Sequence, residues 1–357
     1  MFYCCLAITK IQLFIEKLLF LPHYFGVGNF SYINILNVGD ADAIVINYRD
    51  NSNRWWTIVV DAGNVGDGAK VKSYIKHVEN SIYYIDYAVC THPDKDHKGG
   101  FFDLYEDRTV VISNFVFANP EDILSKDFRR LNFSTGYLVN QGKKTYNHPN
   151  YNTRNLIDII RRRGTNIYQW SNGVDFVGVP LKIVGPSEQF LKDSIYEMAL
   201  DFAELEDEAD GELYNEDEKL TDKEALSVMD TETETSPTNK ASLILLFHPE
   251  NRKFLLAGDA CARSIHDVVD MYGDDVIGCT LKVPHHGSKH NLTTEVIDLL
   301  SPQSATISCK GSKKHPNSGV VYWLSKYCNV YSTAKSGTLT YQSIPVKHPA
   351  IPLKMKQ

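Results

Sequence analysis

The chain has 357 residues, of which 43% are hydrophobic and 23% are charged. This is the composition of a soluble globular protein with enough apolar material for a large core, and the length permits one large α/β domain or two smaller ones. The net charge is −7, but the segment from Asp201 to Glu234 holds fifteen acidic residues against two lysines, so the rest of the chain carries about +6. A mildly basic body of this kind tolerates an anionic substrate without requiring one.

Residues 1–29 are expected to form a helical N-terminal extension. The apolar run from Met1 to Ile8 is interrupted by Lys10, Glu16 and Lys17, whereas a membrane span needs about 20 apolar residues. The segment also lacks the early positive charge and the small-residue cleavage site of a secretory signal. We therefore expect a short amphipathic helix packed on the body, with weak membrane-surface contact as the alternative, no transmembrane segment and a cytoplasmic location.

The cysteines fit a reducing compartment. Their number is odd, no C-x-x-C pair occurs, and several lie in apolar, strand-like runs. We expect them to be small buried hydrophobic residues, not disulfide partners or thiolate metal ligands. They are Cys4, Cys5, Cys90, Cys261, Cys279, Cys309 and Cys328.

Short runs rich in Ile, Val and aromatic residues predict β-strands in both halves of the chain. In chain order these strands are Tyr32–Val38, Ala43–Tyr48, Trp55–Val60, Ile85–Cys90, Leu181–Val184, Ser242–Phe247, Lys253–Ala257, Thr280–Val283, Ala305–Ser308 and Val330–Thr333. Helices are predicted at Ala69–Val78, Asn155–Arg162, Ala262–Met271, Thr293–Leu300 and Gly319–Tyr327. Because both element types recur in both halves, a layered α/β body is favoured over an all-α or all-β one.

This alternation is interrupted from about residue 187 to 240. Glu, Asp, Thr and Ser dominate the segment, and few large apolar residues follow Leu205. We expect an acidic insertion that is helical at first, over Phe190–Leu205, and partly disordered later. A solvated loop is the simpler interpretation; an arm that binds a protein partner, regulates the protein or mimics nucleic acid is the alternative.

The densest group of chemically capable residues follows the strand predicted at Ile85–Cys90, in the run T-H-P-D-K-D-H-K-G-G at residues 91–100. His92, Asp94, Asp96 and His97 bring two imidazoles and two carboxylates together within six residues. Neutral imidazole nitrogen and carboxylate oxygen bind divalent metals, and a turn past a strand end can aim them at one cavity. A charged turn with two surface histidines is the alternative.

Two later strands also end in ligand-type residues. The apolar strand predicted at Lys253–Ala257 is followed by Gly-Asp, and a single carboxylate such as Asp259 can bridge two metal ions about 4 Å apart. The next strand is followed by His285 and His286. One of these imidazoles can ligate a metal, while the other can relay protons or contact a leaving group.

Further candidates surround the same rim. Lys282 and Ser288 flank the paired histidines, Lys289 follows them, and Lys310 and His315 come after a later strand. Ammonium and hydroxyl groups at these positions can hold a phosphate. Lys282 and Lys310 are equally well explained as ordinary lysines at strand edges.

Five segments, in this order, resemble the metallo-β-lactamase superfamily and, more narrowly, the C-terminal hydrolase domain of ComEC-type DNA-uptake proteins and its free-standing bacterial relatives. The likeness covers about residues 32–341, less the acidic insertion. The segments are N-V-G-D-A-D-A at 37–43, V-D-A-G at 60–63, the run at 91–100, G-D at 258–259 and K-V-P-H-H-G-S at 282–288. They match the group's V-G-x-G-D-A, D-x-G, S/T-H-x-D-x-D-H-x-G-G, G-D and K-x-x-H-H-G-S patterns.

The resemblance implies a four-layer αβ/βα metallo-β-lactamase sandwich over residues 30–357, interrupted by the acidic insertion. It also implies two divalent metal ions along the edge where the two sheets meet. Residue by residue, it places His92 and Asp94 at one metal and Asp96 and His97 at the other.

The same resemblance assigns the remaining roles. Asp259 would bridge the two metals, and His286 would complete the second. His285 would stand alongside as a proton relay or phosphate contact. Asp61 and Asp42 would be supporting carboxylates that orient the ligands, a common need at such sites.

The sequence departs from the wider superfamily at two points. Asp94 stands where the motif H-x-H-x-D-H has its second histidine. An oxygen ligand makes the first site harder, which favours Mn²⁺ or Mg²⁺ more than an all-histidine site would. With the remaining imidazoles, Mn²⁺ or Zn²⁺ is expected, and Mg²⁺ is the alternative. A further histidine normally lies between this motif and the Gly-Asp. His148 is the one histidine between His97 and His248, but nothing around it marks it as a ligand. Without it the first metal is under-coordinated.

These observations predict a metal-dependent hydrolase, in the first place a phosphodiesterase or nuclease that acts on DNA through a water activated by two metals. Its candidate catalytic residues are Asp96, His285, Lys282 and Ser288. Two alternatives remain: a small-molecule metallohydrolase for a phosphoester, lactone or thioester, and a non-catalytic partner-binding module. Binding of DNA should depend on salt because neutralised phosphates release counterions, whereas a small substrate should be nearly indifferent to it. The sequence does not indicate the oligomeric state.

Overall fold

The computed structural model describes residues 30–118, 153–169, 172–200, 214–215, 219–229, 235–250, 252–311, 315–342 and 350–354. The predicted extension over residues 1–29 and the candidate ligand His148 lie outside these ranges. No helix within them has the length and apolar character that a bilayer crossing needs.

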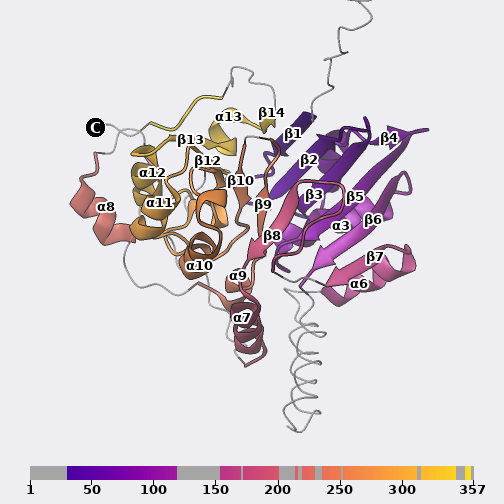
Figure 1. Cartoon of the computed structure of the whole chain (residues 1–357), viewed down its shortest axis with the longest axis horizontal. Helices are drawn as coiled ribbons and strands as arrows, with labels where there is room; N and C mark the ends of the chain where they lie inside the picture. The colour runs from indigo at the N-terminus through magenta and orange to yellow at the C-terminus, as the bar shows by residue number, and fades with distance from the viewer. Residues whose placement is uncertain are drawn as a thin grey trace, which may run out of the picture.

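Among the described residues, the first sheet has eight strands, in the order β14-β1-β2-β3-β5-β6-β7, with β4 paired to β5 (Figure 1). Strands β14, β1, β2 and β3 are antiparallel neighbours, whereas β3, β5, β6 and β7 run parallel. Their bounds are β1 Phe30–Ile35, β2 Ala43–Arg49, β3 Trp55–Ala62, β4 Val78–Glu79, β5 Ile82–Cys90, β6 Val110–Phe117, β7 Asn166–Gln169 and β14 Leu339–Gln342.

The second sheet has six strands, in the order β13-β12-β11-β10-β9-β8. Strands β10 to β13 are parallel, and β8 and β9 are antiparallel to their neighbours. Their bounds are β8 Leu181–Gly185, β9 Ile244–Phe247, β10 Phe254–Leu256, β11 Thr280–Lys282, β12 Ser304–Ile307 and β13 Asn329–Ser332. Ligands in α/β proteins bind beyond the carboxyl ends of parallel strands, so those ends of both sheets are the places to look for a site.

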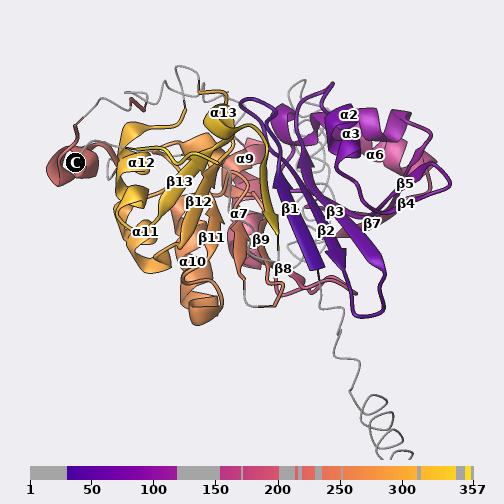
Figure 2. The same ribbon diagram turned by 90° about the horizontal axis from the view of Figure 1, so that it is seen from above.

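The two sheets face each other, and helices cover their outer faces (Figure 2). Helices α2 (Gly68–Ser73), α3 (Lys95–Glu106) and α6 (Thr153–Arg162) lie against the first sheet. Helices α10 (Ala262–Tyr272), α11 (Thr294–Leu300) and α12 (Ser318–Ser325) lie against the second. This is a four-layer αβ/βα sandwich, so the predicted fold class is confirmed.

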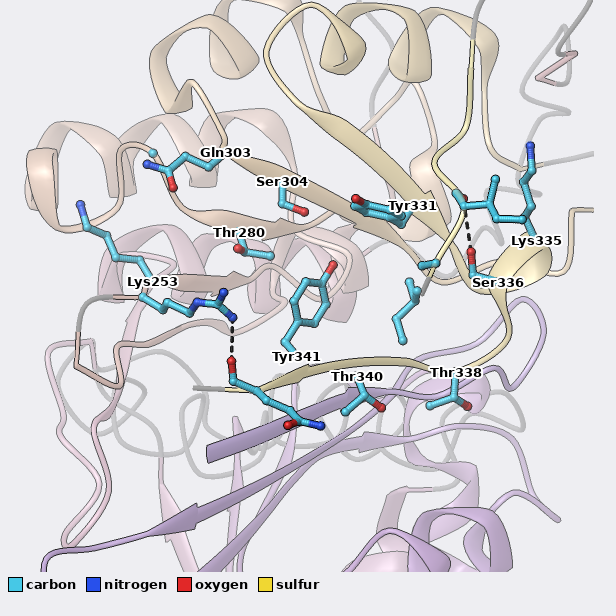
Figure 3. Close-up of a pocket in the computed structure, with 16 residues that line it drawn as sticks. Lys253, Thr280, Gln303, Ser304, Tyr331, Lys335, Ser336, Thr338, Thr340 and Tyr341 are labelled. Atoms are coloured by element: carbon cyan, nitrogen blue, oxygen red, sulfur yellow. Dashed lines mark hydrogen bonds between the residues drawn. The ribbon is translucent and has the colours of Figure 1, made fainter. Parts of the chain in front are cut away.

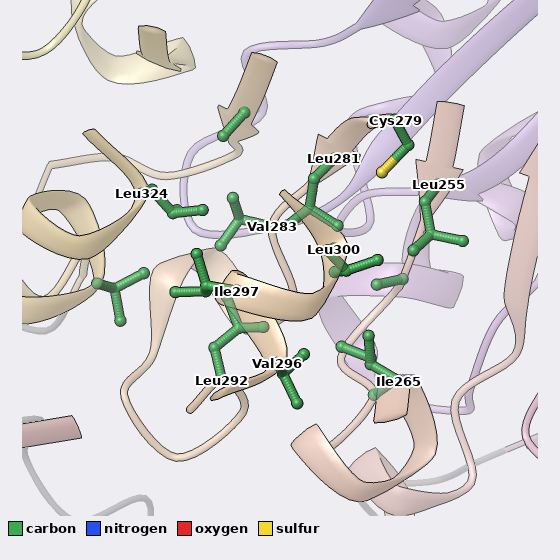
Figure 4. Close-up of a cluster of buried hydrophobic side chains, with 14 of the residues drawn as sticks. Leu255, Ile265, Cys279, Leu281, Val283, Leu292, Val296, Ile297, Leu300 and Leu324 are labelled. Carbon is green, nitrogen blue, oxygen red and sulfur yellow. The ribbon is translucent and has the colours of Figure 1, made fainter. Parts of the chain in front are cut away.

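Three buried apolar clusters hold the layers together. One fills the space between the sheets, with Ile33 and Ile46 from the first sheet against Leu245 and Phe247 from the second. A second cluster lies under α3 and α6. Figure 4 shows the third, in which strand residues such as Leu281 meet α11 and α12. Because burial of one such side chain contributes about 1.5–3 kcal/mol, these clusters fix the spacing of the layers.

Each predicted strand has a counterpart in the structure, but several elements were not predicted. The unpredicted strands are β4, β6, β7 and β14, and the most consequential unpredicted helix is α3, because it begins inside the run at residues 91–100. Within the acidic segment the structure describes α7 (Glu188–Leu200), α8 (Asp222–Met229) and α9 (Pro237–Lys240). A short helix, α13 (Thr333–Ser336), precedes β14.

The cysteines follow the prediction where the structure describes them. Cys90, Cys261, Cys279 and Cys309 are buried and Cys328 is partly buried, and none of these five forms a disulfide. Burial raises the pKa of the Cys279 and Cys328 thiols to about 12. Burial thus favours the protonated thiol over the thiolate at neutral pH.

Candidate metal centre

The candidate ligands meet at one edge of the sandwich. Strand β5 ends just before His92, β10 just before Asp259, and β11 just before His285 and His286. The carboxyl ends of strands from both sheets therefore supply candidate ligands. Residues from the two sheets meet here, because Asp259 Oδ2 lies 3.3 Å from His97 Nε2. Residues that are more than 150 positions apart are brought together by the packing of the two sheets.

Helix α3 changes the expected local geometry of the first motif. Asp94 precedes its first residue, so Asp96 and His97 lie in the first helical turn and not in an open turn. Two glycines permit this approach. A Cβ at Gly100 would lie 2.1 Å from the carbonyl oxygen of Ala62 in β3, so only glycine lets the helix start this close to the strand.

The first group of candidate ligands comprises His92, His97 and Asp259, with one ligand atom of each within 4.8 Å of the others. Asp259 Oδ2 lies 3.7 Å from His92 Nε2 and 3.3 Å from His97 Nε2, so it faces both imidazoles. Asp94 Oδ2 lies 3.6 Å from His92 Nε2. Ligand atoms about 2.1 Å from a tetrahedral ion are about 3.4 Å apart, which matches this spacing.

The second group comprises Asp96, His97 and His286, again within 4.8 Å of one another. Asp96 Oδ2 lies 3.6 Å from His97 Nε2 and 3.2 Å from His286 Nε2. The two groups share His97, so they adjoin. Both groups can hold a divalent ion, and the assignment of each residue to one ion or the other stays a prediction.

Two of these histidines are fixed through their outer nitrogens. His97 Nδ1 lies 2.8 Å from Asp61 Oδ2, and His286 Nδ1 lies 2.9 Å from the carbonyl oxygen of Ser308. Both partners are acceptors, so Nδ1 carries a proton and donates it in each case. The lone pair is then on Nε2, which points into the cluster, the arrangement that supporting carboxylates and carbonyls produce at metal sites.

His92 is oriented in the same way by a hydroxyl. Thr91 Oγ1 donates to Asp61 Oδ2 at 2.7 Å and lies 3.1 Å from His92 Nδ1, from which it accepts. The Nε2 atoms of His92 and His97 are buried and have no hydrogen-bond partner among the described residues. Unpartnered buried polar atoms are rare and need an explanation. A divalent cation fits these residues, because it would satisfy both atoms at once.

Three residues of the centre have a left-handed backbone: Asp61 at φ 54°, His285 at φ 44° and His286 at φ 54°. Each such conformation costs a non-glycine residue about 1–3 kcal/mol and persists where surrounding structure imposes it. Here the turn separates the two adjacent imidazoles. His286 Nε2 faces Asp96, whereas His285 Nδ1 faces Asn291.

The electrostatics favour a bound cation. Burial would lower the pKa of His97, but the carboxylates of Asp259, Asp61 and Asp96 outweigh it and hold this pKa well above its usual range. Burial would raise the pKa of Asp259, but His97 outweighs it and holds that pKa well below its usual range. The pKa of His286 is raised, because its hydrogen bond to Asp96 and nearby carboxylates outweigh burial. Without metal, the protonated imidazoles of His97 and His286 supply the positive charge that balances these carboxylates.

Metal affinity is therefore expected to rise with pH across the neutral range. The pKa values of His97 and His286 are raised, so both imidazoles hold protons that a metal ion must displace, and this competition weakens as pH increases. The affinity should rise by up to about tenfold per pH unit for each proton displaced. Calorimetric titration with Zn²⁺ or Mn²⁺ in buffers of different ionisation enthalpy measures the protons released. Binding that releases no protons at neutral pH would contradict this assignment.

Lys282 was expected to hold a substrate phosphate, but the structure places its side chain in the interior. Its ammonium bonds Asp42 Oδ2, and both side chains are 1% exposed. Asp42 Oδ1 in turn lies 3.8 Å from His286 Nδ1. The described geometry thus makes Lys282 the buried partner of a carboxylate behind the centre and not a free cation at its mouth.

Two other predicted substrate contacts are buried. Ser288 is 1% exposed, and its hydroxyl accepts a hydrogen bond from the His290 backbone at 3.2 Å, which places it in the turn and not on the rim. His315 lies beside the paired histidines, with ring centroids 5.3 Å from His285 and 5.7 Å from His286. His315 is therefore brought to the centre, although it is not part of either ligand group.

The remaining cationic candidates lie nearer the surface. Lys289 is partly exposed, and its ammonium has no contact within the part of the chain that the structure describes. The Lys310 side chain is exposed, and its backbone N–H donates to Asp40 Oδ1 at 2.7 Å. Both lysines are available to an anionic substrate, and their roles stay predictions.

Several residues of the centre were not singled out from the sequence. They supply the acceptors for the histidine Nδ1 atoms: the Thr91 hydroxyl, the Ser308 carbonyl and the Asn291 amide. Thr91 lies within the predicted motif, so its position was a usable signal. A backbone carbonyl carries no sequence signal, and an isolated asparagine in a polar loop is indistinguishable from a solvated one.

A polar pocket of about 750 Å³ lies elsewhere, beside the amino ends of β10 to β12 (Figure 3). Thr280, Ser304, Tyr331 and Tyr341 line it, and Lys253 lies at one end. None of its described lining residues is acidic or belongs to the candidate ligands. It is therefore separate from the metal centre, which lies at the carboxyl ends of the same strands.

The ordered motifs meet at the edge of a four-layer sandwich, where two adjoining ligand groups share His97. The chain has the metallo-β-lactamase fold. No family model matches it. ComE operon protein 3 of Bacillus subtilis (strain 168) is 30% identical over 107 residues, which are 29% of this chain and 14% of that protein. The match thus spans a small part of the relative's length.

The chain is similar to several solved structures of low sequence identity. They include Zn²⁺-bound PqqB from Methylobacterium extorquens, with a TM-score of 0.43 and 12% identity over 84% of this chain and 86% of that one. CmlA, a diiron β-hydroxylase from Streptomyces venezuelae, has a TM-score of 0.37 and 14% sequence identity, and the match covers 81% of this chain and 46% of that one. A long form RNase Z from yeast has a TM-score of 0.35 and 9% sequence identity, and the match covers 79% of this chain and 37% of that one. At such identities, neither a metal nor a substrate is carried over to this chain.

Proposed function

We propose that the chain is a metal-dependent phosphodiesterase that cleaves DNA. The observation that carries this proposal is the pair of adjoining ligand groups that share His97, in which the buried Nε2 atoms of His92 and His97 have no hydrogen-bond partner among the described residues. Such a site is built to receive cations. Two-metal sites with ions about 3.5–4 Å apart serve in-line displacement at phosphorus.

In this proposal each ligand has a distinct part. His92 and Asp94 would hold one ion, Asp96 and His286 would hold the other, and Asp259 would serve both. His97 would support the second ion, and Asp61 and Thr91 hold the His97 and His92 imidazoles through their Nδ1 atoms. The mixture of carboxylate and imidazole suits Mn²⁺ or Zn²⁺, with Mg²⁺ admissible.

Bound divalent ions would supply an activated water at neutral pH and stabilise charge on the attacked phosphorus. The chain's own residues complete the site. His285 adjoins Asp259, because its backbone N–H donates to Asp259 Oδ1 at 3.2 Å, and its imidazole can accept or pass a proton. Lys289 and Lys310 are exposed enough to contact the phosphates that flank the scissile bond.

Three observations favour DNA over a small substrate. The motif set resembles that of ComEC-type hydrolases, and a part of the chain is 30% identical to ComE operon protein 3. The chain outside the acidic segment is basic, at about +6, which suits a polyanion. Asp94 in place of a second histidine makes the first site harder, in keeping with phosphodiester chemistry.

The proposal is tested by assaying plasmid and oligonucleotide DNA beside a small chromogenic phosphodiester, each with Mn²⁺, Mg²⁺ and Zn²⁺. We expect metal-dependent cleavage of DNA, with a KM that rises steeply with salt because DNA binding releases counterions. Asp96→Ala should abolish cleavage of every substrate.

Three outcomes discriminate. If only the chromogenic substrate is cut, with no dependence on salt, the chain is a small-molecule hydrolase and the nuclease assignment is wrong. If wild type and Asp96→Ala behave alike on every substrate, the metallohydrolase assignment itself is wrong. A chain that binds metal but cuts nothing would favour a partner-binding module.

A further inference from the structure

His285 is anchored in the same way as the candidate ligand histidines. Its Nδ1 lies 2.9 Å from Asn291 Oδ1, just as the Nδ1 atoms of the other three histidines lie against a hydroxyl, a carboxylate and a carbonyl. Asn291 is 0% exposed. A fully buried asparagine that bonds an imidazole of the centre is a candidate to control that imidazole.

The direction of this hydrogen bond follows from the other end of the Asn291 amide. Its Nδ2 lies 2.8 Å from the backbone carbonyl oxygen of Asp259 and 3.4 Å from that of Ala260. Carbonyl oxygens only accept, so Nδ2 must face them and Oδ1 must face His285. An amide oxygen cannot donate. Nδ1 of His285 therefore carries the proton.

A second amide beside the ring does not change this assignment. Asn239 Nδ2 lies 3.4 Å from His285 Nδ1, a longer separation than the 2.9 Å to Asn291 Oδ1. Asn239 Nδ2 donates one of its two hydrogens to Thr235 Oγ1 at 3.1 Å, a closer contact than the one to His285, and Asn291 Nδ2 lies 3.4 Å from the same hydroxyl. The Thr235 hydroxyl thus contacts both amides. Asn239, near the end of the acidic segment, lies beside the His285 ring.

A neutral imidazole with its proton on Nδ1 has its lone pair on Nε2, and His285 Nε2 has no hydrogen bond within the described part of the chain. We propose that Asn291 is a positioning residue that holds His285 as the Nδ1–H tautomer, with Nε2 as a proton acceptor at the metal centre. The attacking water then gives its proton to Nε2 as its oxygen bonds phosphorus. The bond from phosphorus to the leaving oxygen breaks, that oxygen takes a proton from solvent, and the imidazolium returns its proton to solvent.

The tautomer is independent of the substrate, whereas its use in catalysis rests on the proposed function. The decisive readout is nuclear magnetic resonance of ¹⁵N-histidine in the full chain with Zn²⁺ added, with His285 assigned by its loss in His285→Gln. We expect a protonated Nδ1 and a proton-free Nε2 in the wild type. A proton on Nε2 with a bare Nδ1 overturns the proposal whatever the protein hydrolyses.

Variants of Asn291 supply the kinetic test. Asn291→Leu keeps the volume and removes both the acceptor for His285 and the donor to the Asp259 carbonyl, so kcat should fall by about 10–100-fold, as for other supporting residues at metal sites. Zinc content, measured in the same samples, separates an effect on His285 from a loss of metal. Asn291→Asp, which keeps an acceptor, should recover part of the loss. An Asn291→Leu protein with the wild-type tautomer and kcat overturns the proposal.

The matched control is Asn47→Leu. Asn47 is also 0% exposed, and its amide donates to the Tyr74 carbonyl at 2.9 Å, remote from the metal centre. Its loss should lower stability and leave kcat and the His285 tautomer unchanged. If wild-type protein cuts no phosphodiester but shows the expected tautomer, the proposed function fails and the assignment of Asn291 stands.

Discussion

Asp259→Asn is expected to lower kcat/KM by on the order of 10³-fold, the upper end of what loss of one electrostatic group costs. The Asp259 carboxylate oxygen faces both His92 Nε2 and His97 Nε2 at 3.7 and 3.3 Å, so an amide there weakens the ligand group that these three residues form. The asparagine keeps the volume, and its oxygen can still accept from the His285 backbone. We therefore expect a folded protein with less bound metal, measured by steady-state kinetics and elemental analysis of the same samples.

An exposed carboxylate supplies the control for this variant. Asp193 accepts a bond from Gln189 Nε2 at 2.9 Å on the surface of α7, so Asp193→Asn should retain wild-type activity and metal content. An Asp259→Asn protein with full metal content and wild-type kcat/KM would show that this carboxylate does not lie between the ions.

Lys282→Met is expected to lower the free energy of unfolding by about 3–5 kcal/mol, the cost of leaving one member of a buried ion pair unpaired. Lys282 and Asp42 are each 1% exposed, so water cannot replace the lost ammonium. Urea denaturation, monitored by circular dichroism, measures the change. If Lys282 instead holds a substrate phosphate, the variant should keep its stability and raise KM.

Two further variants separate these readings. Asp42→Asn combined with Lys282→Met removes both charges and should recover much of the stability, because replacing a whole buried pair costs far less than breaking it. Lys289→Met changes a partly exposed lysine without contacts among the described residues. It should leave stability unchanged and raise KM for DNA in a salt-dependent way.

The layers of the fold were predictable because their strands carry strong local signals. Ile44, Val45 and Ile46 in β2 and Ile58, Val59 and Val60 in β3 are runs of β-branched residues, and all six are buried. Helix α3 was not predicted, since Gly99 and Gly100 disfavour a helix locally. The close approach to β3 overrides that preference, and a tertiary contact of this kind is invisible in a single sequence.

The sequence marks the candidate ligands and the supporting carboxylates Asp61 and Asp42, but not the rest of their support. His92, Asp94, Asp96 and His97 cluster within six residues, so composition alone marks them. The partner of Lys282 lies 240 positions away, and no local pattern distinguishes a buried lysine of this kind from one at a strand edge. The acceptors for His97 and His286 Nδ1, which are Asp61 and the Ser308 carbonyl, follow or end neighbouring strands of the same sheet, so they arise only when each sheet forms.

The most direct test of the central claim is the metal stoichiometry of the purified chain, measured by calorimetric titration and elemental analysis. The two adjoining ligand groups predict about two divalent ions per chain, with fewer ions bound in Asp259→Asn. A wild-type chain that binds no divalent ion at neutral pH, although it is folded, would contradict the account.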